Sequence, residues 1–313
     1  MKREYWNAVI IGLFCLSVVL GVAILVRRGE TLATHPRLGA VPLVSAPRFA
    51  LVDVSGPIYY NDAGDRWLVR DARHIVRKLK QYAEDSSIKG ILLRINSPGG
   101  TVGAVQELHA QLMKLRDEKT GKPVVCFVPE LCASGGYYLA SAADRIVCTP
   151  GAILGSIGVI MQTGDFSALM KKIGVKVVVV KSARFKDIGS PWREMDPEER
   201  RILEDIVMTA YDQFVDAVAA GRDMTPEQVR AFADGRIVPA PRAVDLKMAD
   251  QLGSEDDAVE ALKNLAGITG NVEWVRDTDF RDYLRSLVGE FRAPVSPVER
   301  MMRTGFRVAY LME

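Results

Sequence analysis

The chain has 313 residues, of which 48% are hydrophobic and 26% are charged, so it is long enough to bury one large core or two modest ones. Its 41 basic and 39 acidic residues are evenly spread and give a formal net charge of +2, which excludes the concentrated cationic surface that nucleic-acid binding requires. We therefore expect a globular protein that does not bind nucleic acid.

Residues 1–29 predict a membrane anchor. Residues 6–26 (WNAVIIGLFCLSVVLGVAILV) carry no charge, and at about 1.5 Å per residue they match the roughly 30 Å core of a bilayer. A cleaved signal peptide is the alternative, because residues 43–46 (LVSA) suit a cleavage site, but this apolar run is longer than the usual signal core. Basic residues flank both ends of the run, so local charge does not fix its orientation.

Residues 30–47 contain three prolines and are expected to form a tether. Beyond it, apolar runs typical of strands alternate with helical periodicity over residues 48–270. Near-continuous β-branched runs indicate strands that are covered on both faces, hence a mostly parallel sheet in an α/β domain. The expected strands begin at Phe49 and then cover Gly90–Pro98, Pro123–Glu130, Arg145–Pro150 and Val175–Ser182.

Helical stripes are expected between and after these strands. Two lie early in the chain, at Val69, Ala72, Val76, Leu79 and Ala83 and at Val102, Val105, Leu108, Leu112 and Leu115. Later helices are expected to begin after Asp196, Thr225 and Ser254, which are N-cap residue types, and the first of these has a buried stripe at Ile202, Ile206, Ala210, Phe214 and Ala217. Residues 271–313 are expected to form a C-terminal helical extension that packs on its own body or a neighbouring subunit, or else contacts a membrane surface.

Two glycine-containing turns are candidates for catalysis. Residues 95–102 (INSPGGTV) place Gly99 and Gly100 between a strand and a helix, where backbone N–H groups can face a developing oxyanion, although an ordinary tight turn explains them equally well. Ser134 in CASGGYY is predicted to open a helix, either as a simple N-cap or as a nucleophile whose oxyanion meets the Gly135 N–H.

A nucleophilic serine needs a base, and the histidines are poorly placed to supply one. His35, His74 and His109 all precede Ser134, and their surroundings are typical of a tether or of helix faces. A lysine in residues 181–195 (KSARFKDIGSPWREM) is the other option. An amine at a partly buried strand end loses hydration of its charged form and can accept a proton when neutral.

These stretches together resemble the signal peptide peptidase A family of membrane-anchored bacterial serine peptidases. The resemblance covers Phe49 to about Gly253 and rests on four motifs in order: SPGG, ASGGYY, GSIGV (residues 155–159) and KDIGSPWREM. It implies that Ser134 is the nucleophile, that Lys186 is the general base, and that Ser156 orients the lysine. It also implies that Gly99, Gly100 and Gly135 form the oxyanion hole.

The resemblance carries further expectations. It implies a Clp/crotonase-like spiral of β-β-α units in the short, single-domain form of the family, assembled as a homo-oligomeric ring. It also implies a single-pass protein of the bacterial inner membrane with its catalytic domain on the extracytoplasmic side, acting on cleaved signal peptides and other apolar peptides. Neither a cofactor nor a metal is expected, and the dyad is either supplied by one subunit or shared between two. A departure from the family in residues 235–253, which lack the threonine-glycine pair of relatives, concerns a local turn.

Two other functions compete with this one. A crotonase-like acyl-thioester enzyme also uses paired backbone amides, but no glutamate stands beside SPGG or ASGG to act as its acid or base. A non-catalytic membrane scaffold, in which Ser134 only caps a helix, is the third possibility. The four cysteines match no metal motif and are expected to act as small apolar residues.

Overall fold

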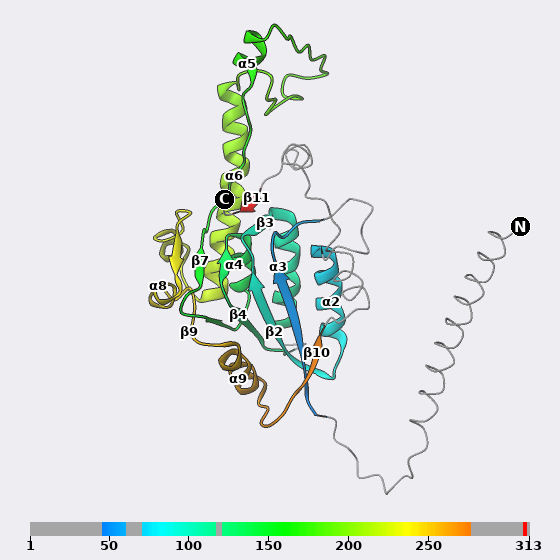
Figure 1. Ribbon diagram of the computed structural model, residues 1–313, viewed down its shortest axis with the longest axis vertical. Coiled ribbons are helices and arrows are strands. Elements are labelled where there is room, and N and C mark those ends of the chain that lie inside the picture. Colours follow the sequence, from blue (N-terminus) through cyan, green and yellow to red (C-terminus); the bar gives the residue numbers. More distant parts are fainter. Residues whose placement is uncertain (1–45, 61–70, 117–120, 277–308, 312–313) are drawn as a thin grey trace, which may run out of the picture. The chain divides into compact units, whose positions relative to one another are not determined.

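The computed structural model describes residues 46–60, 71–116, 121–276 and 309–311 (Figure 1). The expected membrane span at residues 6–26 and most of the tether lie outside this part of the chain. Among the described residues, no helix has the length and apolar character that crossing a bilayer requires.

A parallel sheet forms the centre of the described body. Its strand order is β10-β1-β2-β4-β6-β9, and every pairing along it is parallel. The α/β class and the mostly parallel sheet predicted from the β-branched runs are therefore confirmed. The strands are β1 (Arg48–Ser55), β2 (Ile88–Asn96), β4 (Val124–Val128), β6 (Arg145–Cys148), β9 (Gln251–Leu252) and β10 (Glu273–Arg276).

Short strands follow the long ones and form a second set of pairings. β5 (Leu131–Ala133) is parallel to β7 (Ile153–Gly155), and β7 is antiparallel to β8 (Ile237–Pro239). β3 (Gly99–Thr101) is antiparallel to β11 (Ala309–Leu311). With helices α3, α4 and α5, the chain runs through β-β-α three times, as β2-β3-α3, β4-β5-α4 and β6-β7-α5.

Helices cover both faces of the main sheet (Figure 1). Alternate residues of β1 show the two sides: Val52 belongs to the larger buried cluster with α2, α3 and α4, whereas Phe49 belongs to a smaller one with α9. The helices are α2 (Ala72–Glu84), α3 (Val102–Arg116), α4 (Gly135–Ala140), α5 (Ser167–Lys172), α6 (Pro197–Arg222), α7 (Pro226–Arg230), α8 (Ala240–Asp245) and α9 (Glu255–Ala266).

The predicted helix starts are confirmed. Asp196, Thr225 and Ser254 are the N-caps of α6, α7 and α9, and each accepts a hydrogen bond in a reciprocal capping box. A capping box satisfies N–H groups that the first helical turn leaves without partners. These starts are encoded within four residues, which is why the sequence predicts them well.

Two sequence predictions about this region are wrong. Val175–Ser182 forms no strand: its residues are exposed, with Val180 at 96%, because the described chain offers this run no neighbouring strand. Ile206, expected on the buried stripe of α6, is 42% exposed, whereas Ala210 and Phe214 are buried. The second half of α6 belongs to the large buried cluster, while its first half, in which Glu199 and Leu203 are buried, extends toward α5 (Figure 1).

Candidate active site

Ser134 lies at the junction between β5 and α4. β5 is held on one side by the bridge between Cys132 and Ser97 and on the other by β7, whose Gly155 accepts a 2.7 Å hydrogen bond from the Ser134 N–H. Ser134 has φ 52° and ψ −118°, a conformation that favours glycine. A serine held in such strain by surrounding strands is typical of a functional position.

The Ser134 side chain is buried and without a partner. The residue is 0% exposed, and its Oγ has no hydrogen-bond partner among the residues described. It occupies the N-cap position of α4 as predicted, but its side chain makes no capping bond. A buried hydroxyl without a partner costs free energy, about 1–3 kcal/mol, so the simple capping role does not account for this serine.

The predicted glycines surround Ser134 at close range. A Cβ added at Gly135 would lie 3.0 Å from the Gly100 backbone N and 3.3 Å from Gly99 Cα, so the three glycines meet without side chains between them. The Gly99 N–H already donates to Ser97 Oγ at 3.1 Å. Gly99 O and Thr101 N hydrogen-bond to Ile58, so the Gly100 N–H faces the opposite edge of β3, where β11 pairs with it.

Ser156 lies beside Ser134. Ala133 and Gly155 are register partners in the parallel pair of β5 and β7, so the two serines that follow them are neighbours. Ser156 is 8% exposed, has φ 51°, and donates its N–H to Arg236 O at 2.7 Å. The strand register thus brings together two motifs that are 22 residues apart in the sequence.

Lys186 makes no hydrogen bond to the Ser134 side chain within one chain. It lies in the irregular segment between α5 and α6 and is exposed, whereas Ser134 Oγ is buried and makes no hydrogen bond. The segment also exposes apolar residues, among them Val178 and Val180. Ser134 Oγ and Lys186 therefore share no hydrogen bond within one copy, and the role of Lys186 as the general base stays a prediction.

His109 is a half-buried histidine on α3, and it is not bonded to Ser134. Its ring lies edge-on to Tyr138 with centroids 4.9 Å apart, and its Nε2 is buried without a partner in the described structure. Burial lowers the pKa of His109 to about 4, with a smaller contribution from Arg116. It is a neutral packing residue at physiological pH.

A second place where a ligand could bind is a cavity that Ser134 does not line. A cavity of about 570 Å³ opens at the ends of β1 and β2, with Asp53, Arg94 and Glu255 in its wall, and none of the predicted catalytic residues lines it. In the part of the chain that the structure covers, no group of three or more His, Cys, Asp or Glu side chains could hold a metal ion.

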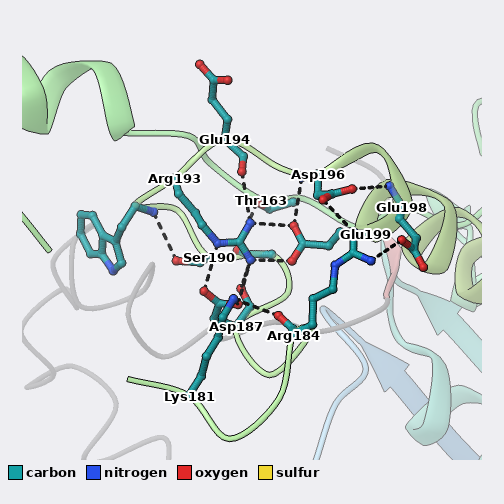
Figure 2. A network of polar contacts seen from close by, with 12 residues as sticks. Thr163, Lys181, Arg184, Asp187, Ser190, Arg193, Glu194, Asp196, Glu198 and Glu199 are labelled. Carbon is teal, nitrogen blue, oxygen red and sulfur yellow. Dashed lines mark hydrogen bonds and ion pairs between the residues drawn. The ribbon is translucent and has the colours of Figure 1, made fainter. Parts of the chain in front are cut away.

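An ion cluster that the sequence motifs did not predict includes Asp187, the residue after Lys186. Arg193 donates to both Asp187 and Glu199, and Lys181 donates to Asp187 (Figure 2). The sequence contains an indication of this cluster, because acidic residues stand six positions before and six positions after Arg193.

Comparison with known proteins identifies the family. A family model described as peptidase family S49 matches residues 116–269. The chain is 39% identical over 69% of its length to "Putative protease slr0021" of Synechocystis, covering 78% of that protein. The chain belongs to peptidase family S49. This family includes signal peptide peptidase A, so the resemblance stated from the motifs is confirmed.

Two further relatives agree with this assignment. "Putative protease MJ0651" of Methanocaldococcus jannaschii is 34% identical over 86% of the chain, which covers 85% of that protein. "Putative signal peptide peptidase SppA" of Enterococcus faecium is 36% identical over 66% of the chain, which spans 60% of that relative's length. The chain is thus a serine-type peptidase by family, which disfavours the acyl-thioester enzyme and the scaffold.

Proposed function

We propose that this protein is a membrane-anchored serine endopeptidase in which Ser134 is the nucleophile and Lys186 of a second copy is the general base. One observation carries the proposal: Ser134 Oγ is buried in a strained backbone with no partner, beside Gly100 and Gly135. In a purely structural role this hydroxyl would be expected to have a hydrogen-bond partner. As a nucleophile, it lacks only a base that can accept its proton.

The exposed loop with Lys186 supports a shared site. Lys186 is exposed in its own chain, and the valines before it form an apolar surface that a neighbouring copy can cover. A strand-forming run such as Val177–Val180 also gains hydrogen bonds when a second chain lies beside it. We therefore propose a ring of identical subunits with a Clp/crotonase-like spiral fold, in which each loop reaches the serine of the next subunit.

The chemical steps follow from this arrangement. The neutral Lys186 amine takes the proton of Ser134 while Oγ bonds to the substrate carbonyl carbon, and the carbonyl electrons move to its oxygen. The N–H groups of Gly135 and of Gly100, the latter once substrate replaces β11 at that edge, stabilise the oxyanion, while Gly99, whose N–H is donated to Ser97, provides the turn. The C–N bond then breaks and the lysine ammonium protonates the leaving amine.

The acyl-enzyme is hydrolysed by the reverse order of proton transfers. Lys186 takes a proton from water, the hydroxide attacks the Ser134 ester, and Oγ leaves with the proton that the lysine holds. Ser156, next to Ser134 in the strand register, orients the lysine amine in this proposal. No cofactor is needed for the balance of atoms or protons.

The substrates we propose are extended, apolar peptides such as remnant signal peptides. β3 accepts β11 as an antiparallel strand along the edge that carries the Gly100 N–H, which indicates that an extended peptide can pair there. Residues 6–26 would anchor the protein in the bacterial inner membrane, with the peptidase on the extracytoplasmic side. That location brings the site close to peptides released within the bilayer.

Mixing two inactive variants tests the shared dyad. Ser134→Ala and Lys186→Ala are each expected to abolish cleavage of a fluorogenic apolar peptide. Co-assembly of equal amounts should restore about one quarter of parent activity, because one neighbour pair in four combines an intact serine with an intact lysine. A fluorophosphonate probe should label the parent at Ser134. Full activity of Lys186→Ala would refute the base, and no recovery in the mixed assembly would refute sharing.

A further inference from the structure

Arg193 is the centre of an ion cluster (Figure 2), one member of which, Asp187, directly follows Lys186 in the sequence. Its Nε and Nη2 donate to the two carboxylate oxygens of Asp187 at 3.0 and 2.8 Å, and its Nη1 and Nη2 donate to those of Glu199 at 2.7 and 2.5 Å. Nη2 also donates to the Asp187 backbone carbonyl at 3.2 Å. One guanidinium thus binds two carboxylates in the bidentate manner that lysine cannot reproduce.

The cluster is anchored to α6 through Glu199. This residue is 2% exposed and belongs to the capping box of α6, where its side chain accepts the Asp196 N–H at 3.0 Å. Arg193 therefore connects a fixed point at the start of the helix to Asp187, the residue directly after Lys186. A second cation, Lys181, donates to Asp187 at 2.6 Å.

The charges in the cluster balance. Arg193 and Lys181 are cations, and Asp187 and Glu199 are anions. Hydrogen bonds from Arg193 hold the pKa of both carboxyl groups below their usual values, with Lys181 contributing at Asp187, so both are ionised at neutral pH. Losing Arg193 would leave charged carboxylates rather than neutral acids beside the loop.

Two other charged groups near the loop have partners of their own, and the carboxylate of a third, Glu194, points away from the cluster (Figure 2). Arg184 pairs with Asp196 at 3.0 Å and with Glu198 at 2.7 Å at the start of α6. Asp165, on the segment that packs against Pro191, accepts the Ser167 N–H at 2.9 Å. In the part of the chain described, the Lys186 ammonium has no ion pair, and the adjacent Asp187 carboxylate is already bound by two cations.

We propose that Arg193 is a positioning residue for the Ser–Lys reaction: it binds Asp187 and Glu199 in one cluster, so that the Lys186 amine is presented on a fixed loop with no carboxylate partner. This inference rests on the proposed function of Lys186. A free carboxylate next to the amine would favour its protonated form, and the protonated form cannot accept the proton of a serine. Arg193 acts through Lys186 and does not touch the substrate.

The pH profile of Arg193→Gln tests the proposal. We measure kcat/KM for an apolar fluorogenic peptide between pH 6 and 10. We expect the acidic limb to move to higher pH by up to about 0.5–1 unit, because Asp187 then keeps only Lys181 as a cation and Glu199 loses Arg193. Arg193→Gln/Asp187→Asn should move the limb back. Arg184→Gln is the matched control: Arg184 lies in the same loop but pairs with Asp196 and Glu198 at the start of α6, so its loss leaves Asp187 bound and the acidic limb should stay in place.

Arg193→Lys helps to distinguish an effect on the pH profile from an effect on the folding of the loop. It retains one charge but cannot bind both carboxylates bidentately, so it should give a smaller shift in the same direction. A fall in kcat with an unmoved acidic limb, or a shift that Asp187→Asn fails to reverse, would mean that Arg193 only stabilises the loop, and the proposal would be wrong.

A readout that does not depend on catalysis separates the two proposals. The rate at which Lys186 reacts with an amine-directed acylating reagent, followed by peptide mass spectrometry, should show the same shift of its pH midpoint in Arg193→Gln. If Lys186→Ala cleaves peptides as fast as the parent, the proposed base is wrong, whereas the labelling midpoints still decide whether Arg193 controls the amine. Equal midpoints in parent and Arg193→Gln would overturn the inference.

Discussion

Gly100→Ala is expected to disrupt the proposed oxyanion hole while the protein stays folded. A Cβ at this position would lie 2.7 Å from Ile58 Cα and closer still to the Ile58 carbonyl group, which is backbone and cannot rotate away. β3 would have to move by about 1 Å or more to relieve the overlap. The Gly100 N–H would move with it, relative to Ser134.

The size of the effect follows from the geometry. A displacement of about 1 Å in a catalytic group costs on the order of 100-fold in rate, and the loss of one oxyanion donor costs about 100- to 1,000-fold. We therefore expect kcat/KM of Gly100→Ala to fall by about 100- to 1,000-fold for a fluorogenic peptide, mainly through kcat. Gly100 does not have positive φ, so the effect is steric and not due to backbone strain.

Gly103→Ala is the matched control. Gly103 lies three residues further on, in the first turn of α3, and an added Cβ would have no neighbour within 4 Å. It should leave kcat/KM unchanged and change the free energy of unfolding by no more than about 1 kcal/mol. If thermal unfolding shows Gly100→Ala to be folded and its kcat/KM stays within about 5-fold of the parent, the Gly100 amide is not part of the reaction.

Three further predictions follow from the same region. Ser134→Gly should be inactive yet more stable than the parent by about 1–3 kcal/mol in chemical denaturation, because glycine removes the strain at φ 52°; equal or lower stability would contradict strain at the nucleophile. The half-buried, neutral His109 has its pKa lowered to about 4, below its unfolded value, so its contribution to stability is complete above about pH 6.5 and is lost as the pH falls toward 4, by up to about 2–3 kcal/mol. His109→Phe should flatten that part of the stability profile, and an unchanged slope would count against this origin. Removing residues 309–313 should lower KM for peptides, because β11 pairs with the proposed substrate edge; an unchanged KM would mean that substrate does not pair with β3.

Local sequence patterns predicted those elements whose stability is itself local. The helix starts at Asp196, Thr225 and Ser254 depend on hydrogen bonds spanning three or four residues, and the structure has all of them. Val175–Ser182 has the same β-branched composition as the buried strands, but a strand also needs a partner. Composition cannot report whether the same chain supplies that partner, so this prediction failed.

The residues of the candidate site show the same difference between features that one chain forms by itself and features that need a partner. Gly99, Gly100, Gly135 and Ser156 lie close to Ser134 because each stands within a few residues of a parallel pairing, Ser97 with Cys132 or Ala133 with Gly155. The sequence motifs therefore point to neighbours in space. Lys186 follows no paired strand in the chain, and its motif alone could not tell whether one copy completes the dyad.

The two halves of the proposed dyad are held by different forces. Ser134 is fixed by strand pairings on both sides of β5 and is itself buried, so salt and pH have little effect on the position of its backbone. Lys186 is carried by a segment whose order comes from charge, with Arg193 bridging an exposed loop to the first turn of α6. Pairs of this kind weaken as carboxylates are protonated or as salt screens them. Because the loop contributes little to the core, changes in its charges should alter the base without unfolding the nucleophile, and this is what makes the role of Arg193 measurable in an otherwise intact peptidase.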